Sequence, residues 1–118
     1  MQAKDALGRR GEDLAADYLE HEGFRILERN YRCSQGEIDI VAAEHRTLVA
    51  CEVKTRSGVG FGTPAEAVTR QKLRRLRRLT VHWAQQHHLT FDGLRVDVVG
   101  VLRSGSGEFS IEHLRGVG

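Results

Sequence analysis

Four charged side chains, Glu37, Asp39, Glu52 and Lys54, interrupt the two most strand-like stretches of the chain, and the types of the last three fit metal-assisted phosphate chemistry. Asp39 lies within GEIDIVAA, and Glu52 and Lys54 lie within TLVACEVKT. Two carboxylates about 4 Å apart repel by roughly 1 kcal/mol in water and by about 4 kcal/mol at an intermediate dielectric. A divalent cation removes that repulsion, and hard oxygen ligands suit Mg²⁺ or Mn²⁺. A nearby lysine could orient a water or stabilise developing negative charge.

The spacing of these residues favours a shared face of a β-hairpin. Only three residues separate the two strand-like stretches, which predicts an antiparallel pair. Side chains alternate between the faces of a strand, so Glu52 and Lys54 point the same way, and the right register brings Asp39 beside them. The alternative is a solvent-exposed strand face that carries an ordinary Glu–Lys pair.

The remaining elements are predicted from hydrophobic periodicity and from the residues that start and stop helices. Apolar residues at a 3.6-residue spacing predict a first helix that ends at Gly23. Thr63, Pro64 and Glu66 form a capping box that predicts the start of a second helix, which runs to His87 or His88. The predicted order is a helix over residues 5–22, strands over 24–31, 36–43 and 47–55, the second helix, a strand over 94–102, and a short edge strand over 108–114.

The length and composition indicate one soluble α/β domain. The chain has 118 residues, which suits a single domain over 1–118, with a core over about 5–102, an edge strand beyond it and a loose tail. No apolar run reaches the roughly 20 residues of a membrane span, and the N-terminal residues lack the apolar core of a signal peptide. Two cysteines are too few for a disulfide framework, so we expect a cytoplasmic protein.

A basic run on the second helix indicates an anionic partner. The stretch RQKLRRLRR carries six cations in nine residues and no acid. Like charges at positions i and i+4 destabilise a helix, so phosphate binding gives the cluster a physical reason. A solvated helix face and a membrane surface are the alternatives. The candidate nucleic-acid-binding residues are Arg56, Arg70, Lys72, Arg74, Arg75, Arg77 and Arg78.

Longer motifs around the acidic pair carry a resemblance to a known family. D-x(12)-E-x-K on a hairpin resembles the core of the PD-(D/E)XK nuclease superfamily, which includes restriction endonucleases and archaeal Holliday-junction resolvases. The chain as a whole resembles the bacterial YraN-type family, a group assigned to that fold. The residues that carry this resemblance are G-x-x-G-E-D-x-A-A-x-Y-L from Gly8, G-F-x-I-L-x-x-N from Gly23, GEIDIV, CEVKTR and TPAEAV.

The resemblance implies a restriction-endonuclease-like α-β-β-β-α-β core with a central mixed sheet flanked by helices. It implies that Asp39, Glu52 and the backbone carbonyl of Val53 hold Mg²⁺ or Mn²⁺, that Glu12 assists, and that Lys54 is the catalytic lysine. Glu12 alone would also suit the first turns of a helix, where the dipole favours acids. Ile38 stands where the superfamily pattern has its loosely kept proline.

Together these features predict a metal-dependent endonuclease, or a nuclease-fold protein that binds DNA, with branched DNA among its candidate substrates. No feature of the sequence indicates contacts with specific bases. We therefore expect the protein to recognise the structure of DNA and not its base sequence. A homodimer would suit cleavage of two strands. The alternatives are a catalytically silent DNA-binding module and a protein-binding scaffold of the same fold.

Overall fold

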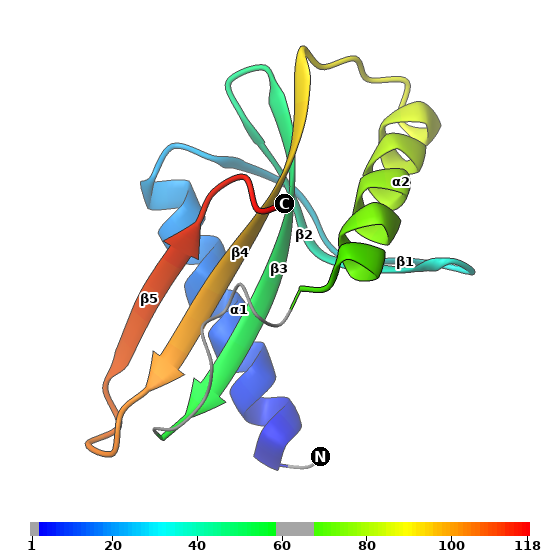
Figure 1. The fold of residues 1–118 in the computed structure, drawn as a ribbon. Helices are drawn as coiled ribbons and strands as arrows, with labels where there is room; N and C mark the ends of the chain where they lie inside the picture. Colours follow the sequence, from blue (N-terminus) through cyan, green and yellow to red (C-terminus); the bar gives the residue numbers. More distant parts are fainter. Residues whose placement is uncertain (1–2, 59–67) are drawn as a thin grey trace.

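The computed structural model describes residues 3–58 and 68–118. The described residues form two helices and five strands in the predicted order (Figure 1). The elements are α1 (Ala3–His21), β1 (Arg25–Cys33), β2 (Gly36–Glu44), β3 (Thr47–Ser57), α2 (Arg70–Gln86), β4 (Gly93–Arg103) and β5 (Phe109–Leu114). The α-β-β-β-α-β order is therefore confirmed, and the predicted edge strand follows it.

The strands form one mixed sheet in the order β1-β2-β3-β4-β5. β1, β2 and β3 pair antiparallel, β4 pairs parallel with β3, and β5 pairs antiparallel with β4. The parallel pair needs a crossover from the end of β3 to the start of β4, and α2 lies within that crossover. β3 is central, so both of its faces are covered.

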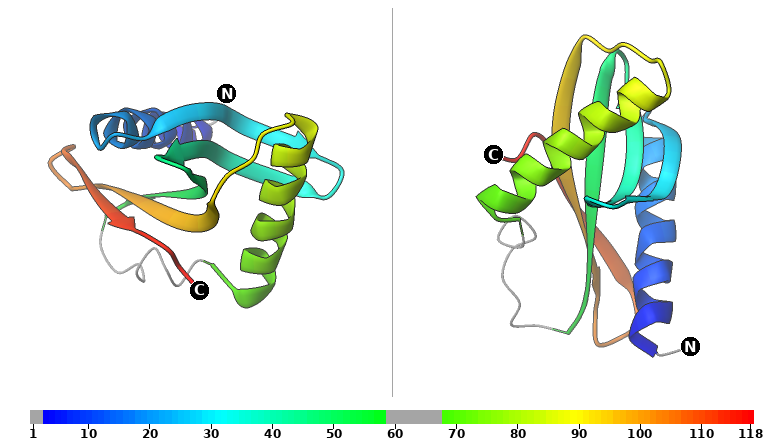
Figure 2. Two further views of the ribbon diagram at one scale, coloured as in Figure 1. Left: turned by 90° about the horizontal axis from the view of Figure 1, so that it is seen from above. Right: turned by 90° about the vertical axis from the view of Figure 1, so that its right-hand side faces the viewer.

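The two helices cover opposite faces of the sheet (Figure 2). Leu19 and the small residues Ala15 and Ala16 of α1 pack with Val49 and Cys51 on one face. On the other face, Leu76, Leu79 and Trp83 of α2 pack on β2, β3 and β4. Each helix therefore buries its apolar stripe on a different side of β3.

Helix α2 begins later than the sequence predicts. The predicted capping box, Thr63 to Glu66, lies outside the described residues. The described helix has Thr69 as its N-cap, in an extended conformation, and the Thr69 hydroxyl accepts the backbone N–H of Lys72 at 3.1 Å. The Thr69 hydroxyl thus pairs the Lys72 amide, which has no partner within the first turn of the helix. This cap explains why the helix starts at Arg70.

Strands β2 and β3 are paired along only part of their length. The register runs from Glu44↔Thr47 to Ile40↔Cys51 and stops there. Beyond it, Ile38 packs with Tyr31 on the α2 side, whereas Ile40 lies on the α1 side. The expected alternation would place Ile38 and Ile40 on one face, and it fails where β2 departs from β3.

The C-terminal tail is held against the sheet, although the sequence suggests a loose end. The Gly116 amide donates to Asp97, and the Val117 amide donates to the Val96 carbonyl at 2.9 Å. Val117 also packs beside the α2-side core. These contacts tie the residues after β5 to β4. Neither helix of the described part combines the length and the hydropathy that a bilayer crossing requires.

Candidate metal and phosphate site

Asp39 and Glu52 lie where β2 separates from β3. Val41 and Ala50 pair on the α2-facing side, and the side chains of Asp39 and Glu52 line one pocket with residues of α2, so both acids lie on that side as well. Past the last backbone pair, Asp39 Oδ2 accepts the backbone N–H of Val53 at 2.8 Å. The Asp39 side chain therefore continues the contact between the strands after the ladder has ended.

The carboxyl group of Asp39 is held in an unfavourable electrostatic environment. Burial and the neighbouring Glu52 raise the pKa of Asp39 to about 6, and the Val53 N–H opposes the rise only in part. The charges of Glu12 and Glu37 raise this pKa further. A group whose charge is disfavoured in this way gains most from a bound cation.

Glu52 is buried and paired with two lysines. Its side chain is 8% exposed, and its Oε1 lies 2.6 Å from Lys72 Nζ and 3.2 Å from Lys54 Nζ. Burial would lower the pKa of Lys72, but the hydrogen bond and the charge of Glu52 outweigh it, so that pKa is raised. In this arrangement two ammonium groups neutralise one buried carboxylate, while Asp39 keeps only its backbone donor among the described hydrogen bonds.

The acidic pair lines a pocket of about 630 Å³ between α2 and the β1–β2 hairpin. Its walls carry both signs of charge. The lining residues are Arg32, Cys33, Gly36, Glu37, Asp39, Glu52, Lys72, Arg75 and Leu76. Anionic oxygen ligands at the floor and cations on the walls suit a divalent cation together with a phosphate group.

Glu12 lies apart from this pocket. Its Oε1 accepts from Arg29 Nε at 3.1 Å, from Arg29 Nη2 at 3.0 Å and from Asn30 Nδ2 at 3.0 Å. Across residues 3–58 and 68–118, no three His, Cys, Asp or Glu side chains stand close enough together to form a metal site. Glu12 influences Asp39 through its charge only, and its predicted part in metal binding stays a prediction.

The donor set that remains fits Mg²⁺ or Mn²⁺. These ions are commonly bound by one or two carboxylates, several waters and substrate phosphates. Asp39 and Glu52 provide two carboxylates beside an open pocket. The N–H and C=O of one strand residue point to the same side, so the Val53 carbonyl faces the gap that its N–H enters. The Val53 carbonyl would therefore add a hard oxygen ligand to the two carboxylates.

The basic side chains of α2 fall into two groups. Lys72 and Arg75 line the pocket, whereas Arg70, Arg74, Arg77 and Arg78 lie exposed along the helix. Within the described ranges, none of the five arginines of α2 makes an ion pair with an acid. Arg56 lies exposed near the end of β3, where its Nη1 donates to the Thr55 carbonyl at 3.3 Å.

The contact between Lys72 and Glu52 is the part of the site that the sequence analysis missed. The basic run predicts that Lys72 belongs to a surface that binds nucleic acid. Its spacing contains the missing signal, because Lys72, Leu76, Leu79 and Trp83 are separated by four, three and four residues. That is the spacing of a single helix face, and the last three residues face the sheet.

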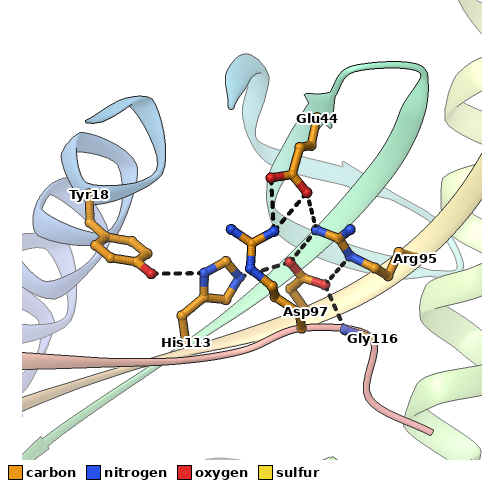
Figure 3. A network of polar contacts seen from close by, with 7 residues as sticks. Tyr18, Glu44, Arg95, Asp97, His113 and Gly116 are labelled. Carbon is orange, nitrogen blue, oxygen red and sulfur yellow. Dashed lines mark hydrogen bonds and ion pairs between the residues drawn. The ribbon is translucent and has the colours of Figure 1, made fainter. Parts of the chain in front are cut away.

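A second polar cluster gathers around Asp97 of β4 (Figure 3), and none of its labelled residues lines the pocket. Asp97 is fully buried and accepts from His113 Nε2 at 2.8 Å, from Arg95 Nε at 2.7 Å and from the Gly116 amide at 2.9 Å. Since a carboxylate only accepts, His113 Nε2 carries the proton, and His113 Nδ1 meets the Tyr18 hydroxyl at 3.0 Å. These hydrogen bonds indicate a structural role for Asp97.

The chain is similar over all or nearly all of its length to proteins of several bacteria. It is 58% identical to a UPF0102 protein of Arthrobacter sp. (strain FB24) over 118 residues, which are 100% of both chains. It is 54% identical to a UPF0102 protein of Beutenbergia cavernae over 118 residues, again 100% of both chains. It is 49% identical to a UPF0102 protein of Frankia casuarinae over 116 residues, 98% of each chain.

One solved structure shows a partial likeness. It is that of Archaeoglobus fulgidus Hjc, described as a Holliday junction resolvase from an archaeal hyperthermophile, and it is 20% identical in sequence. The alignment covers 89% of this chain and 75% of the other, with a TM-score of 0.43. Residues 11–101, which hold all the elements from most of α1 to most of β4, match a single family description. The chain belongs to the family described as Uncharacterised protein family UPF0102.

Proposed function

We propose that this protein is a metal-dependent endonuclease that acts on DNA through the pocket between α2 and the β1–β2 hairpin. The observation that carries the proposal is the pair Asp39 and Glu52 at the point where β2 leaves β3, with Lys54 beside it. The charge of Asp39 is disfavoured by burial and by Glu52, and the pocket beside the two acids has cationic walls. Such a site is suited to binding a metal cation next to a phosphodiester.

In this proposal, Asp39, Glu52 and the Val53 carbonyl hold Mg²⁺ or Mn²⁺. When bound, the cation polarises the scissile phosphate and makes an attacking water easier to deprotonate. Lys54 extends from the same face of β3 as Glu52, and its ammonium group positions that water or offsets the negative charge of the transition state. Glu12 supports the site from α1 through its charge on Asp39.

The arginines of α2 hold the DNA backbone in this proposal. Arg75 on the pocket wall contacts the phosphates nearest the site, and Arg70, Arg74, Arg77 and Arg78 continue the contact along the exposed helix face. Arg56 adds a contact from the end of β3. Contacts of this kind fix the position of a duplex and carry no sequence information, so the substrate is selected by its structure. Two copies of the chain would allow cleavage of both strands.

The decisive experiment is a cleavage assay with labelled branched, flapped, linear and single-stranded DNAs in Mg²⁺ or Mn²⁺. Wild type is compared with Glu52→Ala and Lys54→Ala, and circular dichroism checks the fold of each variant. Cutting that needs the metal and both side chains supports the nuclease and identifies its substrate. Equal cutting by all three proteins, or none by any, contradicts it.

Binding measurements on the same DNAs separate the alternatives if no cutting is found. Tight binding to one structure, unaffected by Asp39→Ala and Glu52→Ala beyond the change in charge, would indicate a silent DNA-binding module. Weak binding that is insensitive to charge reversal at Arg74, Arg77 and Arg78 would instead indicate a protein-binding scaffold.

A further inference from the structure

Lys72 occupies a position on α2 where a buried apolar residue is expected. Leu76, Leu79 and Trp83 continue the same helix face and are buried against the sheet. Lys72 lies one turn before Leu76 on this face. There its ammonium group meets Glu52 of β3. The result is a lysine that reaches inward to Glu52, whereas Arg70, Arg74, Arg77 and Arg78 of the same helix lie exposed.

The contact that Lys72 makes is short and is shared with Lys54. Both ammonium groups approach Glu52 Oε1, Lys72 at 2.6 Å and Lys54 at 3.2 Å. Lys54 alone can neutralise Glu52, so the second ammonium group, that of Lys72, can move away without leaving Glu52 unpaired. Glu52 Oε1 is also one of the oxygens that the proposed function gives to the metal. Lys72 and a divalent cation therefore compete for the same atom.

We propose that Lys72 is an exchangeable counter-ion of this site. Without a divalent cation it neutralises Glu52, and when a cation binds, it is displaced into the pocket, where it contacts a DNA phosphate. This inference rests on the proposed function, because it takes Asp39 and Glu52 as the metal-binding acids. It adds a positioning residue from α2 to the site and couples metal binding to DNA binding.

The surroundings of Lys72 allow this exchange. Its backbone is fixed by the cap, because its N–H donates to the Thr69 hydroxyl, but its long side chain lies at the wall of an open pocket. Arg75 lines the same wall one turn along α2. A displaced ammonium group would join Arg75 at the place where a phosphate has to sit if it is to reach the cation.

The inference predicts opposite effects of one substitution on two ligands. Lys72→Met removes the competing charge and keeps the length of the side chain and the helix propensity. We expect Lys72→Met to bind Mn²⁺ at least about fivefold more tightly than wild type, a coupling of ordinary size. In the presence of Ca²⁺, the same variant should bind DNA more weakly than wild type. The slope of log K for DNA binding against log salt should be reduced by about 1.

The experiment measures free Mn²⁺ by electron paramagnetic resonance during titration of the metal alone, so that it does not depend on cleavage. Lys72→Arg keeps the charge and should resemble wild type. Arg74→Met is the matched control on the same helix, and it should weaken DNA binding without changing the Mn²⁺ affinity. Circular dichroism and thermal melts report the fold, and Lys72→Gln replaces Lys72→Met if the latter is unfolded.

The outcomes distinguish this inference from the proposed function. Binding of Mn²⁺ by wild type that is lost in Glu52→Gln, with no gain in affinity in Lys72→Met, would overturn the role of Lys72 and leave the metal site standing. Absence of specific Mn²⁺ binding in both wild type and Lys72→Met would overturn the metal site and this inference with it. Tighter binding in Lys72→Met alone among the charge variants of α2 supports the exchange.

Discussion

Asp39 Oδ2 accepts the backbone N–H of Val53 at 2.8 Å, one step beyond the last backbone pair of β2 and β3. A side chain thus takes the place of a ladder partner at the point where the strands separate. The contact fixes the carboxylate of Asp39 and leaves its second oxygen for another ligand. Because the same carboxylate is buried and lies near Glu52, its charge is disfavoured until a cation binds.

Asp39→Asn should stabilise the fold at neutral pH. The pKa of Asp39 is raised to about 6, from an ordinary value of 3.8, so the folded state binds this proton more tightly than the unfolded state. Stability is therefore lost as pH rises through this window, and Asn avoids the loss. We expect a gain of up to about 3 kcal/mol at pH 8 and none below about pH 4, measured by urea unfolding across pH.

Asp17→Asn is the matched control for this effect, since Asp17 is an exposed carboxylate on α1. It should change the free energy of unfolding little at any pH. A carbon-13 titration of the Asp39 carboxyl would measure its pKa directly. An ordinary value, near 4, together with no stabilisation in Asp39→Asn, would show that the pair is not electrostatically opposed.

Asp97→Asn should have the opposite effect on stability. Burial alone would raise the pKa of Asp97, but the hydrogen bonds from His113, Arg95 and Gly116 outweigh it and lower the pKa to about 2. The charged form therefore stabilises the fold above about pH 4, and this contribution of about 2 kcal/mol is lost as pH falls toward 2. An amide cannot accept from all these donors, so we expect Asp97→Asn to cost about 3 kcal/mol or more at pH 7.

Asp92→Asn provides the comparison for Asp97. Asp92 also accepts from an arginine, Arg46, at 2.8 Å, but both side chains are about two-thirds exposed. Its loss should cost less than about 1 kcal/mol. Equal effects of the two substitutions in urea unfolding at pH 7 would contradict the structural role of the buried cluster.

The order of elements was predictable because each element carries its own local signal. The alternation in residues 36–55 predicts a hairpin, and the β-branched residues around Val98 predict a strand. The start of α2 was not predictable in the same way. Two threonines, Thr63 and Thr69, both suit an N-cap, and the sequence alone favours the one followed by Pro64. The described helix uses Thr69.

The candidate site was predictable only in part. Some of its contacts follow from local strand geometry, whereas others depend on how the helices pack on the sheet. The shared face of Asp39 and Glu52 follows from strand alternation and a short connection. The partner of Glu52 on α2 depends on how the helix crosses the sheet, which no local pattern specifies. The bonds that hold Glu12 to Arg29 and Asn30 likewise depend on the packing of α1 against β1.

Replacing exposed arginines of α2 should weaken DNA binding in proportion to the phosphate contacts that are lost. If Arg74, Arg77 and Arg78 each contact a phosphate, the triple alanine variant should lower the slope of log K against log salt by about 3. Fluorescence anisotropy at several salt concentrations measures this slope. Arg9→Ala, on the helix that covers the opposite face, should leave this slope unchanged. A similar decrease of the slope in both variants would indicate general electrostatic attraction without a defined DNA-binding surface.

Gly11→Ala should destabilise the protein, because Gly11 of α1 lies against Thr55 of β3 with no room for a side chain. A Cβ at this position would meet the Thr55 side chain, with Cγ2 at 2.7 Å and Cβ at 2.9 Å. Neither atom is the end of a long side chain, so α1 and β3 would have to move apart. We expect a loss of about 1–3 kcal/mol in thermal or urea unfolding, as for other overpacked positions.

Gly8→Ala is the matched control on the same helix, because a Cβ at Gly8 meets nothing within 4 Å. Alanine has the higher helix propensity, so Gly8→Ala should stabilise the protein by up to about 1 kcal/mol. Thr55→Ala in the Gly11→Ala background should recover part of the loss, since it removes the nearest atoms. Thr55 directly follows Lys54, so the strain of Gly11→Ala should also displace Lys54, the lysine of the proposed site. If the proposed cleavage is found for wild type, cleavage by this variant should fall by more than its remaining folded fraction predicts. A fall that matches the folded fraction would show that Thr55 and Lys54 are independent.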